Sequence, residues 1–504
     1  MSAKSLAAKL YARLVYKGIQ RDAARAVECQ DAVMRMLLKS GSKTAFGSDH
    51  RLLDVQSYDE WKQAMPVVEY EALTSYIERA KAGERDVLWP GKPKYFCKTS
   101  GTTSGTKYIP LTHDSMPNHI GTARNALLSY IAETGRSEFT SGKMIFLQGS
   151  PKMDLLPSGI PYGRLSGIVA NHVPAYLQKN RMPSYQTNCI EDWEEKVNRI
   201  ADETLRERMT LISGIPNWVQ MYFEVLLKKS GKQNIHEVFP DFDLFVYGGV
   251  NFEPYRARFE QLIGKRIPII ELYPASEGFL AFQDSQEADG LLLNTNSGIF
   301  FEFIPADEYF NERPTRLSLR EVKVGVNYAL VLSNNAGLWS YSIGDTVKFT
   351  SLNPPRIKVT GRIKHFTSAF GEHVIAEEVE GAMIEVCGSM GVEVNEFHVA
   401  PMVAPSSGLP YHEWLIEADS EIGEDKRKQM AALLDASMQQ RNIYYRDLIQ
   451  GGVLRPAVLT FVRKGAFNDY MRSVGKLGGQ NKVPRLSNDR GIADVLRLIK
   501  MVES

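Results

Sequence analysis

The sequence is poor in cysteine and has no excess of charge of either sign. Its 504 residues include four cysteines, and no two of them form a Cys-x-x-Cys pair. This usage argues against a disulfide framework and against a cysteine zinc site, and it favours a reducing compartment. The 60 Lys and Arg residues nearly balance the 59 Asp and Glu residues, which argues against binding nucleic acid through massed phosphate contacts.

Long apolar runs are also absent. No stretch of about 18 apolar residues occurs, so no membrane-spanning segment is expected. The segment Met1–Gln20 lacks the unbroken apolar core of a signal peptide, because Lys4, Lys9, Arg13 and Lys17 interrupt it. We therefore predict a cytoplasmic protein without a membrane or nucleic acid as partner.

The pattern along the chain predicts a large α/β domain at residues 1–358. Apolar residues recur at helical spacing over residues 5–40. Further on, Leu244–Tyr247 is an apolar strand, a helical run covers Pro254–Ile263, and Ile267–Tyr273 is the next strand. Such a βαβ unit implies parallel pairing with a right-handed crossover.

Beyond residue 358 the pattern changes to a mixture of helices and strands that predicts a smaller α+β domain at residues 359–504. The expected elements are a helix at Ala376–Cys387, strands near Glu396–Val399 and Glu413–Glu417, a long helix at Asp425–Gln440 and a strand at Val458–Val462.

The strongest chemical signal is the segment Thr99–Lys107. It holds six hydroxyl residues and two glycines in nine positions and ends in a lysine. Gly101 and Gly105 allow a tight turn with exposed N–H groups, while the hydroxyls and Lys107 add donors and positive charge. Such a loop can hold polyphosphate oxygens.

This segment is not a Walker A motif. Thr106 and Tyr108 occupy the positions at which that motif needs its second glycine and its Ser or Thr. The flanks Lys94–Lys98 and Tyr108–Leu111 predict two strands around the loop, rather than a strand and a helix. A flexible Ser/Thr/Gly hairpin without a ligand is the alternative interpretation.

The second signal is Tyr273-Pro-Ala-Ser-Glu-Gly278, at the end of a predicted strand. Ligands of open α/β sheets bind beyond the carboxyl ends of strands. There, Tyr273 suits stacking on a base, Ser276 suits a phosphate contact, and Glu277 suits Mg²⁺. An ordinary polar loop that ends a buried strand is the alternative.

The third signal is Tyr341-Ser-Ile-Gly-Asp345. It lies in Tyr328–Thr350, which reads as two strands around a turn at Asn334–Gly337. Asp345 follows Gly344 at a strand bend, where its carboxylate can accept hydrogen bonds from two sugar hydroxyls. A common Gly-Asp turn is the alternative.

In this order and at these separations, the three signals resemble motifs of the Gretchen Hagen acyl-acid amido synthetases. These are the phosphate loop, the Tyr-x-x-Ser-Glu motif and the Tyr-x-x-Gly-Asp motif, and the family belongs to the luciferase-type adenylate-forming superfamily. Pro157–Pro161, Tyr247–Val250 and Asn481–Arg485 agree as well. The resemblance covers roughly residues 10–490.

The resemblance implies a reaction and its cofactors. A member of this family uses ATP and Mg²⁺ to convert a small carboxylic acid to an acyl-adenylate with release of pyrophosphate. The amine of an amino acid then attacks the adenylate, giving an amide and AMP. This sequence departs from the family at Pro274-Ala275 and at Ser342. The second departure casts doubt on any role for a basic side chain there.

The resemblance also implies residue roles. The β- and γ-phosphates would be held by the first loop, at Ser100, Gly101, Thr102, Thr103, Ser104, Gly105 and Lys107. Tyr273 would stack on adenine, Ser276 would contact the α-phosphate, Glu277 would bind Mg²⁺ and Asp345 would hold the ribose hydroxyls.

Further roles concern the acyl group and the second domain. Gly248 and Gly249 would lie beside the nucleotide, with Val250 at the acyl group. Arg164 is a candidate anchor for substrate charge or an ordinary surface arginine. The segment Thr360–Lys364 resembles the hinge of a mobile second domain, where Arg362 or Lys364 would stabilise phosphate. Lys482 resembles the family's C-terminal lysine, which serves adenylation; a solvated tail lysine is the alternative.

Two other functions remain open on the sequence. An acyl-CoA ligase would use the same nucleotide motifs with coenzyme A as the acceptor. A non-catalytic nucleotide-binding protein would keep the motifs without turnover, although the presence of Lys107, Glu277, Asp345 and Lys482 argues against such decay. The sequence indicates neither the acid, the amine nor an oligomeric state.

Overall fold

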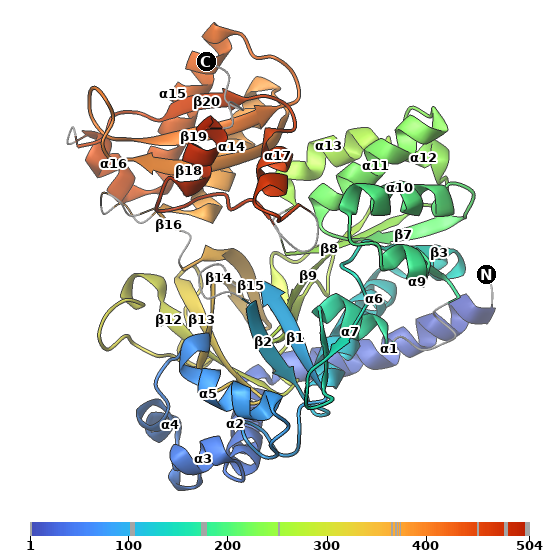
Figure 1. Cartoon of the computed structure of the whole chain (residues 1–504), viewed down its shortest axis with the longest axis vertical. Helices are drawn as coiled ribbons and strands as arrows, with labels where there is room; N and C mark the ends of the chain where they lie inside the picture. Colours follow the sequence, from blue (N-terminus) through green and yellow to red (C-terminus); the bar gives the residue numbers. More distant parts are fainter. Residues whose placement is uncertain are drawn as a thin grey trace. The chain divides into compact units, whose positions relative to one another are not determined.

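The computed structural model describes residues 3–100, 106–172, 179–249, 252–363, 366–367, 370, 372, 374–450, 453–477 and 482–498. They form two compact units, which Figure 1 colours along the chain. The first comprises Met1–Val250 and Leu262–Val359, and the second comprises Asn251–Gln261 and Thr360–Ser504. In the part of the chain that the structure describes, no helix has the length and apolar character needed to cross a membrane.

The first unit is built on one long mixed sheet, with eleven strands among the described residues. Their order is β12 (Ile299–Pro305), β13 (Asn327–Asn334), β14 (Tyr341–Leu352), β15 (Pro355–Arg362), β11 (Leu291–Leu293), β10 (Gly278–Phe282), β9 (Ile269–Ala275), β8 (Leu244–Gly248), β7 (Met209–Ser213), β3 (Lys143–Phe146) and β6 (Arg181–Met182). The pairs from β9 to β6 are parallel, whereas β10 pairs antiparallel with β9 and with β11.

The parallel half of the sheet has the helical crossovers that such pairing requires. Helix α10 (Trp193–Thr204) precedes β7, α11 (Pro216–Ser230) connects β7 to β8, and α13 (Glu253–Ile263) connects β8 to β9. Phe245 of β8 lies opposite Ile269 of β9 in a parallel ladder. The predicted βαβ unit is therefore confirmed.

A second sheet carries the segment around the hydroxyl-rich loop. Its order is β2 (Thr106–Leu111), β1 (Tyr95–Ser100), β5 (Pro161–Gly163) and β4 (Asp154–Leu155). Strands β1 and β2 are antiparallel, and Ser100 lies opposite Thr106 at the end of the ladder. The prediction of two strands around the loop is therefore confirmed.

The N-terminal region differs from the expected uninterrupted helix. It forms α1 (Ala3–Ala24) and α2 (Ala26–Gly41), because Arg25 leaves the helical conformation with φ −120° and ψ 35°. The break lets the two helices cover different parts of the unit. Helix α1 packs along α6 (Met116–Thr134), and α2 packs against β12 (Figure 1).

Among the described residues of the first unit, the remaining α-helices lie in the connections. They are α3 (Ala45–Asp49), α4 (Tyr58–Ala64), α5 (Tyr70–Lys81), α7 (Leu165–Ala170), α9 (Tyr185–Asn188) and α12 (Ile235–Val238).

The second unit has the α+β character that its sequence predicts. Its three-stranded sheet is β18 (Val394–Met402), β19 (Tyr411–Ala418) and β20 (Val458–Val462), with a small pair β16 (Phe366–Thr367) and β17 (Val374–Ile375). The helices described after β17 are α14 (Ala376–Met390), α15 (Glu424–Arg441), α16 (Ile443–Gln450), α17 (Ala466–Ser473) and α18 (Gly491–Leu498). A core around Trp414 and Met430 joins the sheet to α14 and α15. The mixed order of elements is thus confirmed.

A buried ion pair connects the N-terminal helices to the strand that carries Asp345. Glu302 of β12 is fully buried, and its carboxylate accepts from Arg316 Nη2 at 2.6 Å. Trp61 Nε1 and Ser340 Oγ donate to the same carboxylate at 3.3 and 2.9 Å. Ser340 has a φ of 41° and directly precedes β14, so this network holds the entry to the third motif.

Replacing Glu302 with alanine is expected to destabilise the first unit strongly. The substitution leaves the Arg316 guanidinium buried without its counter-ion, which costs about 3–5 kcal/mol. Urea unfolding followed by tryptophan fluorescence measures the effect. The paired variant Glu302→Met/Arg316→Met is the control and should recover much of the loss. An unchanged midpoint for Glu302→Ala would contradict the role of the pair.

A second stability prediction concerns His119 on α6. Burial lowers the pKa of His119 from 6.5 to about 4. Between these two pH values the unfolded chain binds a proton that the folded chain excludes, so the free energy of unfolding decreases as the pH falls from 6.5 to about 4. His119→Leu should lose this part of the pH dependence. His113→Leu, at an exposed position, should keep it. Parallel slopes for His119→Leu and the parent chain over that range would contradict the prediction.

Candidate functional site

Ser276 and Glu277 form the turn between two strands of the long sheet. Ala275 at the end of β9 lies opposite Gly278 at the start of β10, so only these two residues make the connection. The sequence predicted a strand that ends at Tyr273, whereas β9 continues to Ala275 and joins β10 by a tight antiparallel turn. A Cβ on Gly278 would lie 2.4 Å from Ile299 Cδ1, so a side chain here would have to displace the end of the Ile299 side chain.

A contact between Cys97 and Ser276 brings the turn to the strand that leads into the hydroxyl-rich loop. The Cys97 thiol donates to Ser276 Oγ at 3.2 Å. Burial, aided by the Glu277 carboxylate, raises the pKa of Cys97 to about 12, so the thiol keeps its proton and remains a donor. The first two motifs are therefore neighbours, although 179 residues separate Cys97 from Ser276.

A hydrogen bond joins the second motif to the third. The Tyr273 hydroxyl donates to Asp345 Oδ2 at 2.8 Å. Tyr273 exposes 7% of its surface. Burial is the main cause of a raised pKa for Tyr341, and the Glu277 carboxylate is the next, which also places Glu277 near the third motif.

A β-bulge directs Asp345 toward Tyr273. Ala329 of β13 pairs with Thr346, whereas Val331 pairs with Ser342, so β14 contains extra residues between these two pairs. Gly344 lies among them with a φ of 80°, a conformation that glycine adopts without strain. Bulges of this kind re-aim side chains at functional sites.

The glycines after β8 lie close to the same strand. A Cβ on Gly248 would lie 2.6 Å from the carbonyl oxygen of Leu272 in β9, so this position requires glycine. Gly249 has a φ of 82°. The end of β8 is therefore near the segment that carries Tyr273, as the βαβ unit implies.

Lys107 begins the chain's return from the hydroxyl-rich loop. It lies opposite Thr99 in the β1–β2 ladder, and its Nζ is 5.4 Å from the centre of the Tyr70 ring. The Tyr70 hydroxyl accepts the N–H of Tyr108 at 2.9 Å. An aromatic ring thus holds the lysine stem beside the loop through a cation–π contact.

Arg164 is exposed at the start of α7 and packs against backbone. A Cβ on Gly149 would lie 2.8 Å from Arg164 Cδ, so the arginine stem occupies the space beside that glycine. Burial chiefly, and then the charge of Arg164, lowers the pKa of the nearby Lys196 to about 8. The Leu165 N–H bonds to the Cys97 thiol, so the start of α7 lies next to the turn of the second motif.

Several predicted site residues lie outside the described residues or in the second unit. The residues that lie outside the described part of the chain are Gly101, Thr102, Thr103, Ser104, Gly105, Val250 and Lys364. For Ser100 only the backbone is described. Arg362 ends β15 and Lys482 precedes α18, and both are described only within the second unit.

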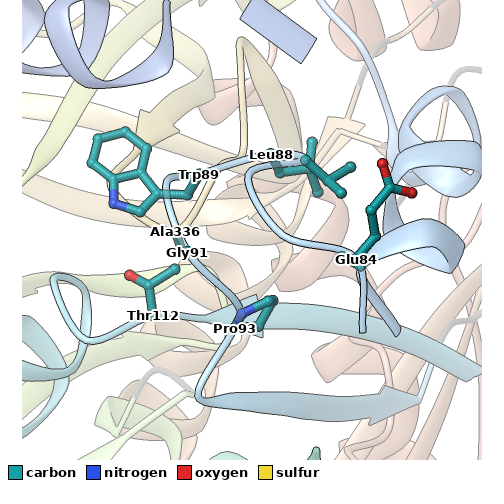
Figure 2. A pocket seen from close by; sticks show the side chains of 9 residues that line it. Glu84, Leu88, Trp89, Gly91, Pro93, Thr112 and Ala336 are labelled. Atoms are coloured by element: carbon teal, nitrogen blue, oxygen red, sulfur yellow. The ribbon is translucent and has the colours of Figure 1, made fainter. Parts of the chain in front are cut away.

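A small cavity lies near the first motif but is not a substrate site. Its volume is about 10 Å³, which is room for a single water molecule. Leu88, Trp89, Pro93, Thr112 and Ala336 are among the residues that line it (Figure 2). None of its lining residues belongs to the three motifs.

Sequence reasoning missed three side chains that contact the Ser276–Glu277 turn or the start of β10 next to it. Cys97 contacts Ser276, Asn118 contacts Phe279 and Asn334 contacts Glu277. Cys97 and Asn118 belong to no motif, and Asn334 was considered only as part of a turn. Their position beside the turn depends on tertiary packing.

Comparison with known proteins gives the same family over most of the chain. Models described as the GH3 family N-terminal, central and C-terminal domains match residues 15–188 with 165–269, residues 292–362 and residues 377–491. The jasmonoyl-L-amino acid synthetase JAR4 of Nicotiana attenuata is 23% identical over 536 residues, which cover 90% of each chain. The indole-3-acetic acid-amido synthetase GH3.3 of Arabidopsis thaliana is 21% identical, over 93% of this chain and 90% of that one.

Solved structures show the same fold. The GH3.15 acyl acid amido synthetase superposes with a TM-score of 0.77 at 16% identity, over 96% of both chains. A 2-hydroxyisobutyryl-CoA ligase in its postadenylation state has a TM-score of 0.60 at 14% identity, over 94% of this chain and 90% of that one. The fold is thus that of adenylate-forming ligases, and the resemblance drawn from the motifs is confirmed. The chain belongs to the GH3 family.

Proposed function

We propose that this chain is an ATP-dependent acyl-acid amido synthetase. Its substrate is a small carboxylic acid, and its acceptor is the amine of an amino acid. The main support for the proposal comes from two contacts. The 2.8 Å hydrogen bond from Tyr273 to Asp345 joins the second motif to the third, and the Cys97–Ser276 contact joins the second motif to the strand that leads into the first. Full-length relatives named as amido synthetases support the same activity.

The reaction has two steps. In the first, a carboxylate oxygen attacks the α-phosphorus of ATP, and pyrophosphate leaves. In the second, the amine nitrogen attacks the acyl carbon, AMP leaves, and the amine loses a proton. The first step brings two anions together, so preorganised donors have the largest effect there.

The phosphate donors come from the segment between β1 and β2. Ser100, Thr102, Thr103 and Ser104 bind the β- and γ-phosphates through hydroxyl and N–H groups, with Gly101 and Gly105 shaping the loop. Lys107 adds a positive charge at the start of β2. The cation–π contact between the Lys107 ammonium group and the Tyr70 ring supports this placement of the charge.

The other nucleotide contacts come from the long sheet. Tyr273 holds the adenine, Ser276 donates to the α-phosphate and Asp345 accepts from the ribose hydroxyls. Gly248 and Gly249 allow the backbone to approach the nucleotide closely, and the lack of room for a Cβ at Gly248 supports this reading.

Glu277 fits a magnesium site that is completed by the nucleotide. Mg²⁺ is usually held by one or two carboxylates together with substrate phosphates, so a single glutamate at the turn suits it. The described residues contain no group of three or more His, Cys, Asp and Glu that would hold a metal without a substrate. Bound Mg²⁺ would neutralise phosphate charge beside Ser276.

The acyl group and the second unit complete the proposal. Val250 lies along the acyl group, and Arg164 anchors charge on the substrate. The second domain predicted from the sequence, residues 359–504, rotates about Thr360–Lys364 between the two steps. Arg362 or Lys364 stabilises phosphate in one state, and Lys482 neutralises the reacting anions during adenylation.

Acid-dependent exchange of labelled pyrophosphate into ATP tests the proposal. Pooled carboxylic acids are offered with Mg²⁺, and exchange in one pool identifies adenylation before the acceptor is known. The product is then analysed with an amino-acid mixture and with coenzyme A. An amide supports the proposal, whereas a thioester alone would establish the acyl-CoA ligase. ATP binding without exchange in any pool would favour the non-catalytic alternative.

A further inference from the structure

The β9–β10 strand pair that ends in the Ser276–Glu277 turn has an irregular register. Phe279 of β10 lies opposite Pro274 of β9, and the register shifts between Phe279 and Ala281. Opposite residues of an antiparallel pair alternate between hydrogen-bonded and non-bonded positions, and Pro274, which has no N–H, occupies a non-bonded one. The Phe279 N–H and carbonyl therefore point away from β9, toward the side on which β11 pairs with β10 only from Ala281 onward. The backbone next to the turn therefore needs a partner from elsewhere in the fold.

Asn118 of α6 supplies the partner for both groups, and Asn294 Nδ2 makes a longer bond of 3.3 Å to the Phe279 carbonyl. Asn118 Oδ1 accepts the Phe279 N–H at 2.7 Å, and Asn118 Nδ2 donates to the Phe279 carbonyl at 3.1 Å. The side-chain amide thus makes the two hydrogen bonds of a neighbouring strand. Asn118 is 6% exposed, so both bonds are shielded from water.

Asn334 holds the other side of the turn. Its Nδ2 donates to the Glu277 carbonyl at 2.6 Å. Its Oδ1 accepts the N–H groups of Ala336 and Leu338, both at 3.0 Å. Because the turn after β13 fixes this amide and Asn334 is 1% exposed, the Glu277 backbone has a rigid neighbour.

Cys97 orients the remaining residue of the turn. Its thiol donates to Ser276 Oγ, so the Ser276 hydroxyl keeps its own hydrogen for another acceptor. The backbone of Leu165, at the start of α7, also contacts the sulfur. Strands β1 and β13 thus each provide one hydrogen bond to the segment Ser276–Phe279, and helix α6 provides two.

We propose that Cys97, Asn118 and Asn334 are positioning residues for adenylation. They hold the Ser276 hydroxyl and the Glu277 carboxylate in place before Mg·ATP binds, so that binding does not have to order the turn. None of the three contacts the reacting atoms. The inference rests on the proposed roles of Ser276 and Glu277.

Conservative variants separate positioning from stability. Asn334→Asp keeps the acceptor for Ala336 and Leu338 and loses only the donor to Glu277. Asn118→Asp keeps the acceptor for the Phe279 N–H and loses the donor to its carbonyl. Cys97→Ala removes the thiol, and Cys97→Ser restores a donor. Asn125→Asp is the matched control on α6, since that side chain accepts from Arg124 instead.

The three loss variants should slow pyrophosphate exchange by about tenfold to a hundredfold, as small displacements of reactive groups do. They should also need more Mg²⁺ for half-maximal exchange. Amide formation from supplied acyl-adenylate, which requires no pyrophosphate release, should stay within about threefold of the parent chain. Cys97→Ser should regain most of the exchange rate, and Asn125→Asp should match the parent chain.

A purely structural role would lower both half-reactions together, in step with the thermal midpoint, and would overturn the inference. Parent-level exchange in all three loss variants would overturn it as well. If the parent chain shows no exchange with any acid, the proposed function fails, and calorimetric binding of Mg·ATP tests the positioning alone. The loss variants should then bind Mg·ATP at least tenfold more weakly; equal affinity, or no binding by the parent chain, overturns the inference.

Discussion

Replacing Lys482 with alanine is expected to slow acyl-adenylate formation by about a hundredfold to a thousandfold, the usual cost of removing a preorganised charge or donor. The proposed role of Lys482 is to neutralise anions while the carboxylate attacks ATP. That role ends when pyrophosphate has left. Amide formation from supplied acyl-adenylate should therefore stay within a few-fold of the parent rate. Exchange of labelled pyrophosphate measures the first step, and single-turnover amide formation measures the second.

A matched lysine controls for the loss of positive charge. Lys476 is exposed and lies in the same segment of the second unit. Lys476→Ala should leave both half-reactions unchanged. Equal loss of both steps in Lys482→Ala would remove the argument that this lysine serves one state of a rotating domain. Parent-level exchange would mark Lys482 as a solvated tail residue.

Changing Asp345 to asparagine is expected to weaken ATP binding by roughly tenfold to a hundredfold. A hydrogen bond to a charged group contributes about 1.5–3 kcal/mol, and each 1.4 kcal/mol corresponds to about tenfold in affinity. The bulge that holds Asp345 depends on Gly344 and the β13–β14 register, so the isosteric change should leave the local fold intact. Calorimetric titration with ATP measures the loss.

Two comparisons assign that loss to the ribose. The parent chain should prefer ATP over 2′-deoxy-ATP, and Asp345→Asn should lose most of this preference. Tyr273→Phe removes the 2.8 Å hydrogen bond to Asp345 but keeps the carboxylate, so it should retain the preference. Unchanged ATP affinity in Asp345→Asn would reject the ribose role. A preserved preference for ATP would place the carboxylate elsewhere in the site.

Several features of the fold follow from local patterns and were predictable from the sequence. The segment Thr99–Lys107 has β-rich flanks, and the structure has β1 and β2 around it. The apolar runs on either side of Pro254–Ile263 became the parallel pair of β8 and β9. In both cases the residues that determine the element lie within one short stretch, so periodicity and turn chemistry suffice.

Other features depend on residues that are far apart in the chain. The helical pattern of residues 5–40 did not reveal the break at Arg25, since packing of α1 on α6 and of α2 on β12 accompanies that break. Similarly, the Gly-Asp pair suggested a strand bend but not its partner. Only the register of β13 with β14 brings Asp345 to the Tyr273 hydroxyl.

The sequence by itself determined the family and the chemistry of the three motifs, because the order and spacing of their residue types are properties of the chain. Only the tertiary structure decided what holds the Ser276–Glu277 turn. Asn118 acts on Phe279 across 161 residues, and its role arises because the pairing of β10 with β11 begins only at Ala281. The backbone groups that a sheet leaves unpaired depend on where its strands begin to pair, and the side chain that bonds them depends on how the helix packs on the sheet.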